Sequence, residues 1–388
     1  MNALFHHRAK IIETYDGSLP LALFLKQYFR QFPVLGSRDR RILSAVAYAH
    51  YRAGKAFEDI SDEKKQIAAE LILSEQDGVE YHRMLEGFTP SEASATLKLR
   101  LAHLTKLGIE AQIDKILPEK IKLSKGIKQS DWLERLLGRT AVFIKAEKGF
   151  EKDIQKRLEK AEIPFEAGST GDFKLKQGVN LEAVLEPKSY RVQDWASQQI
   201  AQYLPAENPL FIWDVCAGAG GKSLILSEHY PKAKLLVSDV RPSILKNLEE
   251  RFKLHRRNLP QMMEIDLTQL PEDIDPLQDQ KANLIVCDVP CSGSGTWGRT
   301  PEQAYFFDPE TLKAFSEKQK AITLRAADFL ADDGTIIYIT CSVFSTENEE
   351  NVKSICKTGN FAVLEQQIIN GFENQADCLF VAVLKRTK

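Results

Sequence analysis

The 388-residue sequence lacks the features that mark secreted, membrane-spanning and zinc-binding proteins. The N-terminus has no apolar core of signal-peptide length, and no run approaches the roughly 18 apolar residues of a membrane span. Six cysteines are present, but none forms a C-x-x-C pair, which argues against a metal site. A cytoplasmic protein with reduced thiols is the simplest interpretation.

An excess of positive charge is also missing. The net charge of −2 argues against a protein that coats nucleic acid non-specifically, although it leaves room for a local basic face. Apolar residues make up 43% of the chain and charged residues 27%, as in globular proteins. The length exceeds one ordinary domain, so we expect two or three.

Residues 1–128 show no strand-like alternation, and we expect them to be helical. Apolar residues recur at helical intervals in 19–32 and 38–52, with Ser37 as a candidate N-cap. The segment 35–52 resembles the RNA-binding helical domain of the NusB type. That resemblance implies a first domain that grips RNA.

The pattern changes to a small α/β module over residues 129–190. Strands are expected at 140–146, from Pro164 onward and at 180–186, with a charged helix over 152–161. This module is either a second RNA-binding subdomain or an extension of the domain that follows.

Strands then alternate with helix-length segments over residues 191–388, which predicts a doubly wound, mostly parallel α/β sheet. The expected strands are 210–215, 234–239, 263–265, 283–288, 335–340 and 378–385. The expected helices are 193–200, 221–230, 243–255 and 309–331.

The stretch 211–223 reads as a strand, an aspartate and a glycine-rich turn that opens a helix, an arrangement that binds anionic or nucleoside cofactors. A P-loop would need glycine where Cys216 stands, and an NAD loop would need glycine or alanine at Ser223. The remaining pattern, D-x-x-x-G-x-G-G, resembles the first motif of class I S-adenosylmethionine methyltransferases. Its residues are Asp214, Gly218, Gly220 and Gly221.

Three further aspartates support a cofactor site. Asp239 ends the next strand, where a carboxylate can accept both hydroxyls of a ribose, and Asp266 and Asp288 follow later strands. Each alone could cap a following helix. Because the C-terminal ends of parallel strands line one crevice, the set predicts cofactor binding.

Two of the cysteines, Cys291 and Cys341, each follow a strand beside small residues, whereas the other four read as small buried hydrophobes. Carbon 5 of a pyrimidine is a poor nucleophile. A thiolate that adds to carbon 6 turns the ring into an enamine-like nucleophile at carbon 5, and Asp288 is a candidate for hydrogen-bonding ring nitrogen 3.

Three motifs together resemble the RsmB/NOP (Fmu/Sun) family of RNA cytosine-5 methyltransferases. They are 214–222, 288–296 and 340–349, with support from 193–198 and 299–302. DNA cytosine-5 methyltransferases share a Pro-Cys nucleophile but lack the second Thr-Cys. The resemblance covers about residues 190–388.

The resemblance implies that Cys341 is the nucleophile and that Cys291 assists release of the methylated RNA. It also implies S-adenosyl-L-methionine as the cofactor. The implied cofactor contacts are Cys216, Ala217, Gly218, Ala219, Gly220, Gly221, Lys222, Asp239, Asp266 and Asp288.

The sequence departs from the family pattern at two places. Gly218 and Ala219 replace the third and fourth residues of the usual Cys-Ala-Ala-Pro-Gly-Gly-Lys loop. Ile244 stands where family members often have arginine, and Arg241 is a candidate substitute.

We therefore expect three domains, 1–128, 129–190 and 191–388, in a monomer that methylates carbon 5 of cytosine in RNA. Ribosomal RNA is the first expectation and transfer RNA the second, with a DNA or protein methyltransferase or a non-catalytic assembly factor as rivals. The basic segments 115–128 and 246–257 are candidates for phosphate contact, although 115–128, with five lysines, also fits a solvated face.

Overall fold

The structure is a computed structural model that describes residues 2–57, 97–106, 108–112, 115–116, 121–138 and 140–387. It divides into two compact units, one of residues 1–121, 128–140 and 296–309 and the other of 122–127, 141–295 and 310–388. The borders of these units differ from those of the three expected domains, and the three-domain division stays a prediction.

The first unit consists of helices in its described part. They are α1 (Asn2–Thr14), α2 (Leu21–Gln31), α3 (Ser37–Ala53), a 3-10 turn (Gly54–Phe57), α7 (Leu97–Lys106), α8 (Gln129–Leu137) and α13 (Pro301–Phe306). The helices expected over 19–32 and 38–52 are present. The N-cap of α3 is Gly36 rather than Ser37, because the Gly36 N–H meets the Asp39 carboxylate at 3.0 Å.

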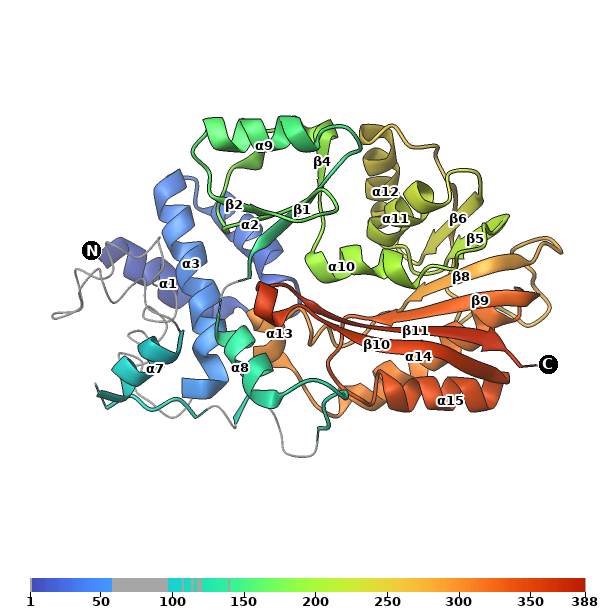
Figure 1. The fold of residues 1–388 in the computed structure, drawn as a ribbon. Coiled ribbons are helices and arrows are strands. Elements are labelled where there is room, and N and C mark those ends of the chain that lie inside the picture. The colour runs from blue at the N-terminus through green and yellow to red at the C-terminus, as the bar shows by residue number, and fades with distance from the viewer. Residues whose placement is uncertain are drawn as a thin grey trace. The chain divides into compact units, whose positions relative to one another are not determined.

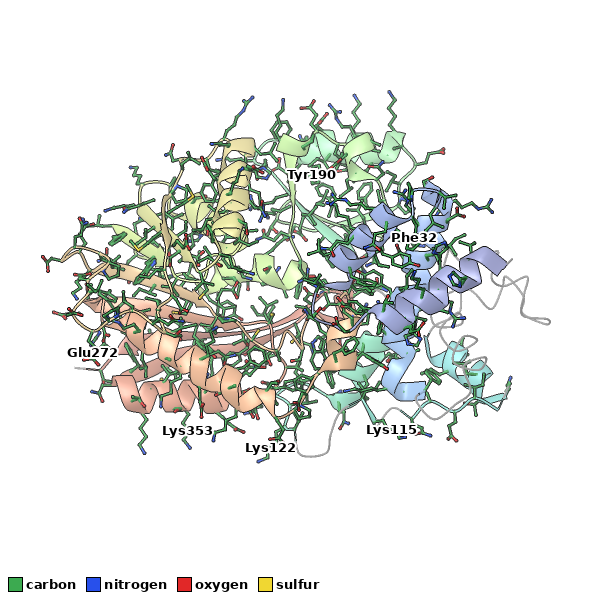
Figure 2. The ribbon with its side chains drawn as sticks, turned by 180° about the vertical axis from the view of Figure 1, so that it is seen from behind. Phe32, Lys115, Lys122, Tyr190, Glu272 and Lys353 are labelled. Atoms are coloured by element: carbon green, nitrogen blue, oxygen red, sulfur yellow. The ribbon has the colours of Figure 1, made fainter. Side chains whose placement is uncertain are left out.

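The second unit opens with a four-stranded antiparallel sheet in the order β2-β3-β1-β4. Its elements are β1 (Val142–Ala146), α9 (Glu151–Lys160), β2 (Phe165–Ala167), β3 (Asp172–Leu175) and β4 (Tyr190–Val192). Ile154 and Leu158 of α9 pack against the core of this sheet, as does Tyr190, which Figure 2 labels.

The strand expected over 180–186 is wrong, because this segment contains a 3-10 turn at Leu181–Ala183. Leu181 and Leu185 are both buried, and the Leu185 N–H donates to the Leu181 carbonyl at 2.7 Å. A spacing of four between buried residues follows a helical rather than a strand period.

The main sheet has seven strands in the order β10-β11-β9-β8-β5-β6-β7 (Figure 1). They are β5 (Phe211–Asp214), β6 (Lys234–Asp239), β7 (Gln261–Glu264), β8 (Ala282–Asp288), β9 (Leu330–Thr340), β10 (Phe361–Asn370) and β11 (Cys378–Arg386). The five strands from β5 to β9 are parallel, and β11 and β10 are antiparallel additions. The expected doubly wound, mostly parallel sheet is confirmed.

Helices cover both faces of this sheet (Figure 1). One face carries α10 (Trp195–Gln199), α11 (Gly221–His229) and α12 (Pro242–Leu254), and the other carries α14 (Thr311–Ala327) and α15 (Glu349–Gly359). On α15, Val352 and Ile355 are buried, whereas Lys353 is exposed (Figure 2). No helix of the described residues is both long and apolar enough to cross a membrane.

Candidate active site

The strand order explains why four distant loops share one edge of the sheet. Strand β5 lies between β6 and β8, with β9 beyond β8, and all four are parallel. The order reverses its direction between β5 and β8, and ligands of such sheets bind outside the carboxyl ends of the strands at this point. The glycine loop, Asp239 and the two cysteine segments all follow these strand ends.

The two predicted cysteines lie in contact. Cys291 Sγ is 3.1 Å from Cys341 Sγ, and the Cys341 N–H donates to Cys291 Sγ at 3.3 Å. Gly295 draws the two segments together, because its N–H donates to the Cys341 carbonyl at 2.9 Å. A Cβ at position 295 would lie 2.0 Å from the Cys378 carbonyl oxygen and 3.0 Å from the Cys341 carbonyl oxygen. The close packing of residue 295 against both backbones therefore requires glycine.

The two thiols differ in environment. The hydrogen bond with Cys341, burial, and negative charge at Cys341 and Glu347 raise the pKa of Cys291 well above its ordinary value. Cys291 therefore keeps its proton at neutral pH. A thiol in this state is a proton donor rather than a nucleophile.

Asp288 is paired with the lysine that ends the glycine motif. Lys222 Nζ lies 2.8 Å from Asp288 Oδ2. Burial by itself would lower the pKa of Lys222, but the Asp288 charge and hydrogen bond outweigh it, and the pKa is raised. The ion pair thus ties the end of the glycine loop to the segment that leads to Cys291.

The glycine loop is held at three backbone positions. The Gly218 N–H donates to Asp239 Oδ2 at 3.0 Å, Arg251 donates to the Ala219 carbonyl at 2.7 Å, and Gln193 donates to the Gly221 carbonyl at 3.0 Å. Sequence reasoning placed Arg251 only in the basic segment 246–257, as a candidate for phosphate contact, and gave Gln193 no individual role. Only membership of Gln193 in the supporting motif 193–198 pointed to it.

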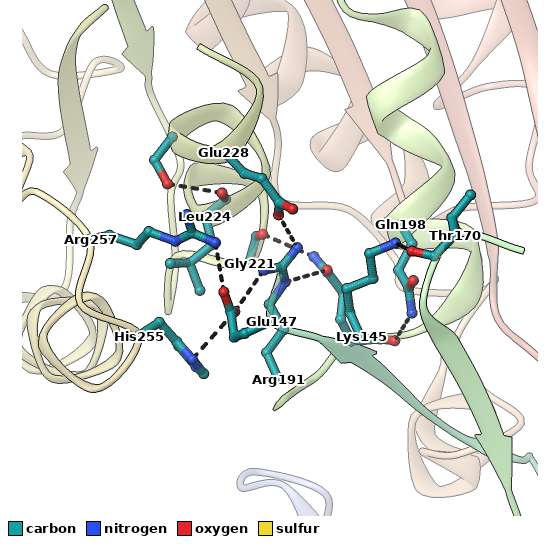
Figure 3. A network of polar contacts seen from close by, with 12 residues as sticks. Lys145, Glu147, Thr170, Arg191, Gln198, Gly221, Leu224, Glu228, His255 and Arg257 are labelled. Atoms are coloured by element: carbon teal, nitrogen blue, oxygen red, sulfur yellow. Dashed lines mark hydrogen bonds and ion pairs between the residues drawn. The ribbon is translucent and has the colours of Figure 1, made fainter. Parts of the chain in front are cut away.

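A polar network between the small sheet and α11 contains Glu147, Arg191 and Glu228, which Figure 3 labels, and Gln193 joins it through Arg191. Arg191 donates to Gln193 Oε1 at 3.2 Å, to Glu147 at 2.8 Å and to Glu228 at 2.5 Å. Arg257 donates to the second oxygen of Glu147 at 2.6 Å. The network links the small sheet to the carbonyl of Gly221 and so to the start of α11.

The remaining predicted cofactor contacts are either packed within the glycine loop or bound in a separate turn. Ala217 is buried, and burial raises the pKa of Cys216, so this part of the loop is packed rather than reactive. Asp266 binds its own turn, accepting from the Thr268 N–H at 2.9 Å and the Thr268 hydroxyl at 2.6 Å. No described contact joins Asp266 to the glycine loop, and its role stays a prediction.

The chemistry of these residues fits a nucleoside cofactor with a positive sulfonium. A Cβ added at Gly218 or Gly221 would meet no atom within 4 Å, so space is open above the loop. Asp239 offers a carboxylate, but Arg241 donates to both of its oxygens, at 2.9 and 3.2 Å. Arg241 would have to give way for a diol to bind Asp239. Ile244 makes no polar side-chain contact of its own.

Gly220 provides a test of the loop conformation. Its φ is +81°, and an added Cβ would lie 2.7 Å from Cγ of the fully buried Leu248. We expect Gly220→Ala to lower the free energy of unfolding by about 1–3 kcal/mol, measured in urea without cofactor. Gly221→Ala is the control, because its Cβ would meet nothing within 4 Å. Equal losses in both variants would contradict the assigned strain.

Comparison with known proteins shows which family part of this chain is similar to. Residues 201–379 match the sequence model of the 16S rRNA methyltransferase RsmB/F family. The matched stretch makes up less than half of the chain. The matched residues contain β5 to β9, the glycine loop and both Cys291 and Cys341.

Curated relatives with a related name are similar to part of this chain. Ribosomal RNA small subunit methyltransferase B of Proteus mirabilis is 28% identical over 176 residues, which cover 45% of this chain and 41% of that protein. The protein of the same name in Shewanella oneidensis is 30% identical over 203 residues, 51% of this chain and 46% of that protein. This chain therefore spans less than half the length of these relatives.

Solved structures share the fold. The structure of PH0851 has a TM-score of 0.67 at 17% identity and covers 93% of each chain. NSun6 from Pyrococcus horikoshii has a TM-score of 0.57 at 17% identity and covers 67% of this chain and 94% of its own. This chain thus shares the α/β fold of these two structures.

Proposed function

We propose that this chain transfers a methyl group from S-adenosylmethionine to carbon 5 of cytosine in RNA, with ribosomal RNA as the first substrate class. The contact between Cys291 and Cys341, 3.1 Å apart beyond neighbouring parallel strands, is the observation that carries the proposal. The names of the curated relatives, small subunit ribosomal RNA methyltransferases, favour ribosomal RNA.

The proposed reaction begins at Cys341. Its thiolate adds to carbon 6 of the cytosine, forming a C–S bond and moving the ring electron pair to carbon 5. Both ring faces must be reachable, so the base has to leave its stack. S-adenosylmethionine, when bound, supplies an electrophilic methyl group. A base, water in the simplest case, then takes the carbon 5 proton, and the electron pair left behind restores the ring double bond and expels Cys341 as thiolate.

Cys291 and Asp288 have supporting roles in this proposal. A thiol that keeps its proton in contact with the departing sulfur supports the assignment of Cys291 to release of the methylated RNA. Asp288 is the candidate partner of ring nitrogen 3, in a hydrogen bond that needs a proton between the two acceptors and that strengthens as nitrogen 3 gains basicity on thiolate addition. Its ion pair with Lys222 fixes the carboxyl group. The cofactor would be held by residues 216–222 and by Asp239, with Asp266 as an expected further contact.

The RNA would be bound by the helical unit, the small sheet and basic residues beside the site. Within the basic segment 246–257, Arg251 and Arg257 are used in internal contacts, whereas Lys246 and Arg256 are exposed. Those two are the better candidates for phosphate contact. Residues 117–120 of the other basic segment lie outside the described residues. A monomer acting in the cytoplasm, where ribosomal RNA is processed, completes the proposal.

Transfer of tritiated methyl groups tests the function. Purified protein is incubated with labelled S-adenosylmethionine and, separately, ribosomal RNA, small ribosomal subunits, transfer RNA, DNA and protein. We expect label in ribosomal RNA or subunits, recovered as 5-methylcytidine after digestion. Label only in DNA or protein would contradict the proposal.

Two other results would select the alternatives. Label in transfer RNA alone would change the substrate class while keeping the chemistry. Tight RNA binding without methyl transfer to any RNA, free or in subunits, would favour a non-catalytic assembly factor.

A further inference from the structure

A buried carboxylate lies directly behind the two cysteine segments. Glu347 is six residues beyond Cys341, in the turn between β9 and α15, and its exposed fraction is 0%. A buried carboxylate is costly unless its oxygens are fully hydrogen-bonded. Its partners therefore show what this carboxylate holds in place.

Glu347 accepts hydrogen bonds from both cysteine segments. Oε1 accepts from the Ser292 N–H at 2.8 Å, and Oε2 accepts from the hydroxyls of Ser292 and Ser342, both at 2.5 Å. Ser292 directly follows Cys291, and Ser342 directly follows Cys341. One side chain thus binds the residue next to each thiol.

A second set of contacts fixes Glu347 itself. Gln319 of α14 donates to Glu347 Oε1 at 2.9 Å and also lies 3.1 Å from the carbonyl of Pro290, the residue before Cys291. The Tyr338 hydroxyl donates to the Glu347 carbonyl at 2.7 Å. Residues of α14 and β9 therefore hold Glu347 in place, and both elements have buried side chains of their own.

The four donors that the described residues give to the Glu347 carboxylate are neutral: a backbone N–H, two hydroxyls and one amide. A cation would cancel the charge, whereas neutral donors only solvate it. The negative charge thus stays active behind the thiols, and it is one of the causes, after the Cys341 hydrogen bond and burial, that raise the pKa of Cys291. A like charge nearby disfavours the thiolate.

We propose that Glu347 is a positioning residue whose carboxylate bridges the two cysteine segments and sets the contact between their thiols. The expected effect of Glu347 on turnover rests on the proposed function, whereas its expected effect on the proton of Cys291 does not. It predicts two separable effects of Glu347: its length fixes the distance between the segments, and its charge keeps the proton on Cys291.

Two variants separate these effects. Glu347→Gln keeps the length and removes the charge, whereas Glu347→Asp keeps the charge and shortens the side chain by one methylene. Glu350→Gln is the matched control, because Glu350 is exposed and accepts from Ser345 rather than from either cysteine segment. Each variant is checked by thermal unfolding and by its dissociation constant for S-adenosylmethionine.

The first readout needs neither RNA nor methyl transfer. Iodoacetamide alkylation of Cys291 in the protein alone is followed against pH by peptide mass spectrometry. We expect Glu347→Gln to move the midpoint downward by about half a unit or more, and Glu347→Asp and Glu350→Gln to leave it near the wild-type value. A midpoint in Glu347→Gln equal to that of the wild type would overturn the charge effect.

The second readout is turnover on the RNA that the wild type methylates. We expect both Glu347 variants to lower kcat by about 10- to 100-fold with KM for RNA little changed, the loss typical when a group that orients a reacting side chain is altered. Wild-type kcat in Glu347→Asp would overturn the bridging role. An inactive wild type would count against the proposed function alone, since the alkylation midpoints would still decide the charge effect.

Loss of folding in a Glu347 variant does not end the test. Ser342→Ala removes one donor, on one segment only, and leaves the charge buried with its other three donors. We expect lower kcat with no downward move of the Cys291 midpoint. Unchanged kcat in this variant would contradict the bridge.

Discussion

We expect Cys341→Ala to abolish methyl transfer, with kcat lower by roughly a thousandfold or more, because Cys341 is the proposed group that forms the bond to carbon 6. The site offers one other thiol within reach, at Cys291. That thiol is held protonated by its hydrogen bond to Cys341, by burial and by nearby negative charge, which raise its pKa. It is therefore a poor replacement nucleophile. Rates are measured with labelled S-adenosylmethionine and the RNA that the wild type modifies.

Cys291→Ala is expected to have a different result. Attack by Cys341 and methylation of carbon 5 should proceed, but release of the RNA should stall. The variant should accumulate a covalent protein–RNA adduct, seen as a band of reduced mobility that survives denaturant and heat. No such band should form with Cys341→Ala, because the first bond is then absent.

Cys356→Ala is the matched control. Cys356 is a half-buried cysteine of α15 that has no part in the proposed chemistry, so turnover should stay at the wild-type level without an adduct. An adduct with Cys341→Ala and none with Cys291→Ala would reverse the two roles. Full activity in both variants would remove the thiols from the mechanism altogether.

Much of the main sheet could be predicted because its parallel strands are buried on both faces and leave a strong pattern. The strands expected over 234–239 and 283–288 are β6 and β8. β10 was not expected, because residues 362–367 are all exposed along the sheet edge, and an exposed strand carries no apolar alternation. The helix expected to run to residue 331 ends at Ala327, and Leu330 already belongs to β9.

The site could be predicted as a set of residue types but not as a set of contacts. The sequence shows which aspartates and cysteines stand at strand ends, because strand-like and helix-length segments alternate along it. In a parallel sheet these ends line one crevice. The arginine pairing of Asp239, the lysine pairing of Asp288 and the bridge by Glu347 depend on side chains from other elements. Glu347 lay inside the motif 340–349, yet nothing in the sequence says that its carboxylate turns inward to Ser292.

Asp214, the aspartate that opens the glycine motif, gives the chain an unusual stability profile. Its exposed fraction is 0%, Oδ2 accepts from the Ser223 hydroxyl at 2.6 Å, and Oδ1 has no hydrogen-bond partner among the described residues. Burial raises the pKa of Asp214 from 3.8 to about 7, against the opposing effect of the Ser223 hydrogen bond. The charged form is thus disfavoured in the folded state.

The sign follows from the direction of this shift. Below pH 3.8 the carboxyl is protonated in both the folded and unfolded states and has no effect on stability. As the pH rises toward 7, the unfolded state ionises first, so the free energy of unfolding falls by about 1.4 kcal/mol per pH unit from this group. Above pH 7 both states are ionised and the cost stays constant.

Asp214→Asn should therefore flatten the pH dependence of stability. An amide oxygen can still accept from Ser223, and the titration is removed. Between pH 5.5 and pH 8, the unfolding free energy of the variant should rise relative to the wild type by about 2 kcal/mol, measured by urea unfolding without cofactor. Using the difference between two pH values cancels any fixed cost of the new amide group.

Asp239→Asn is the contrasting control. Burial would raise the pKa of Asp239, but hydrogen bonds from Arg241 and Gly218 outweigh it and the pKa is lowered. This group is ionised in both states from pH 5.5 to 8, so its stabilising effect is constant there and is lost only as the pH falls through its folded pKa. Asp239→Asn should thus be destabilised equally at both pH values. A relative gain in Asp239→Asn matching that of Asp214→Asn would show that the carboxyl of Asp214 is not the group that titrates near neutrality.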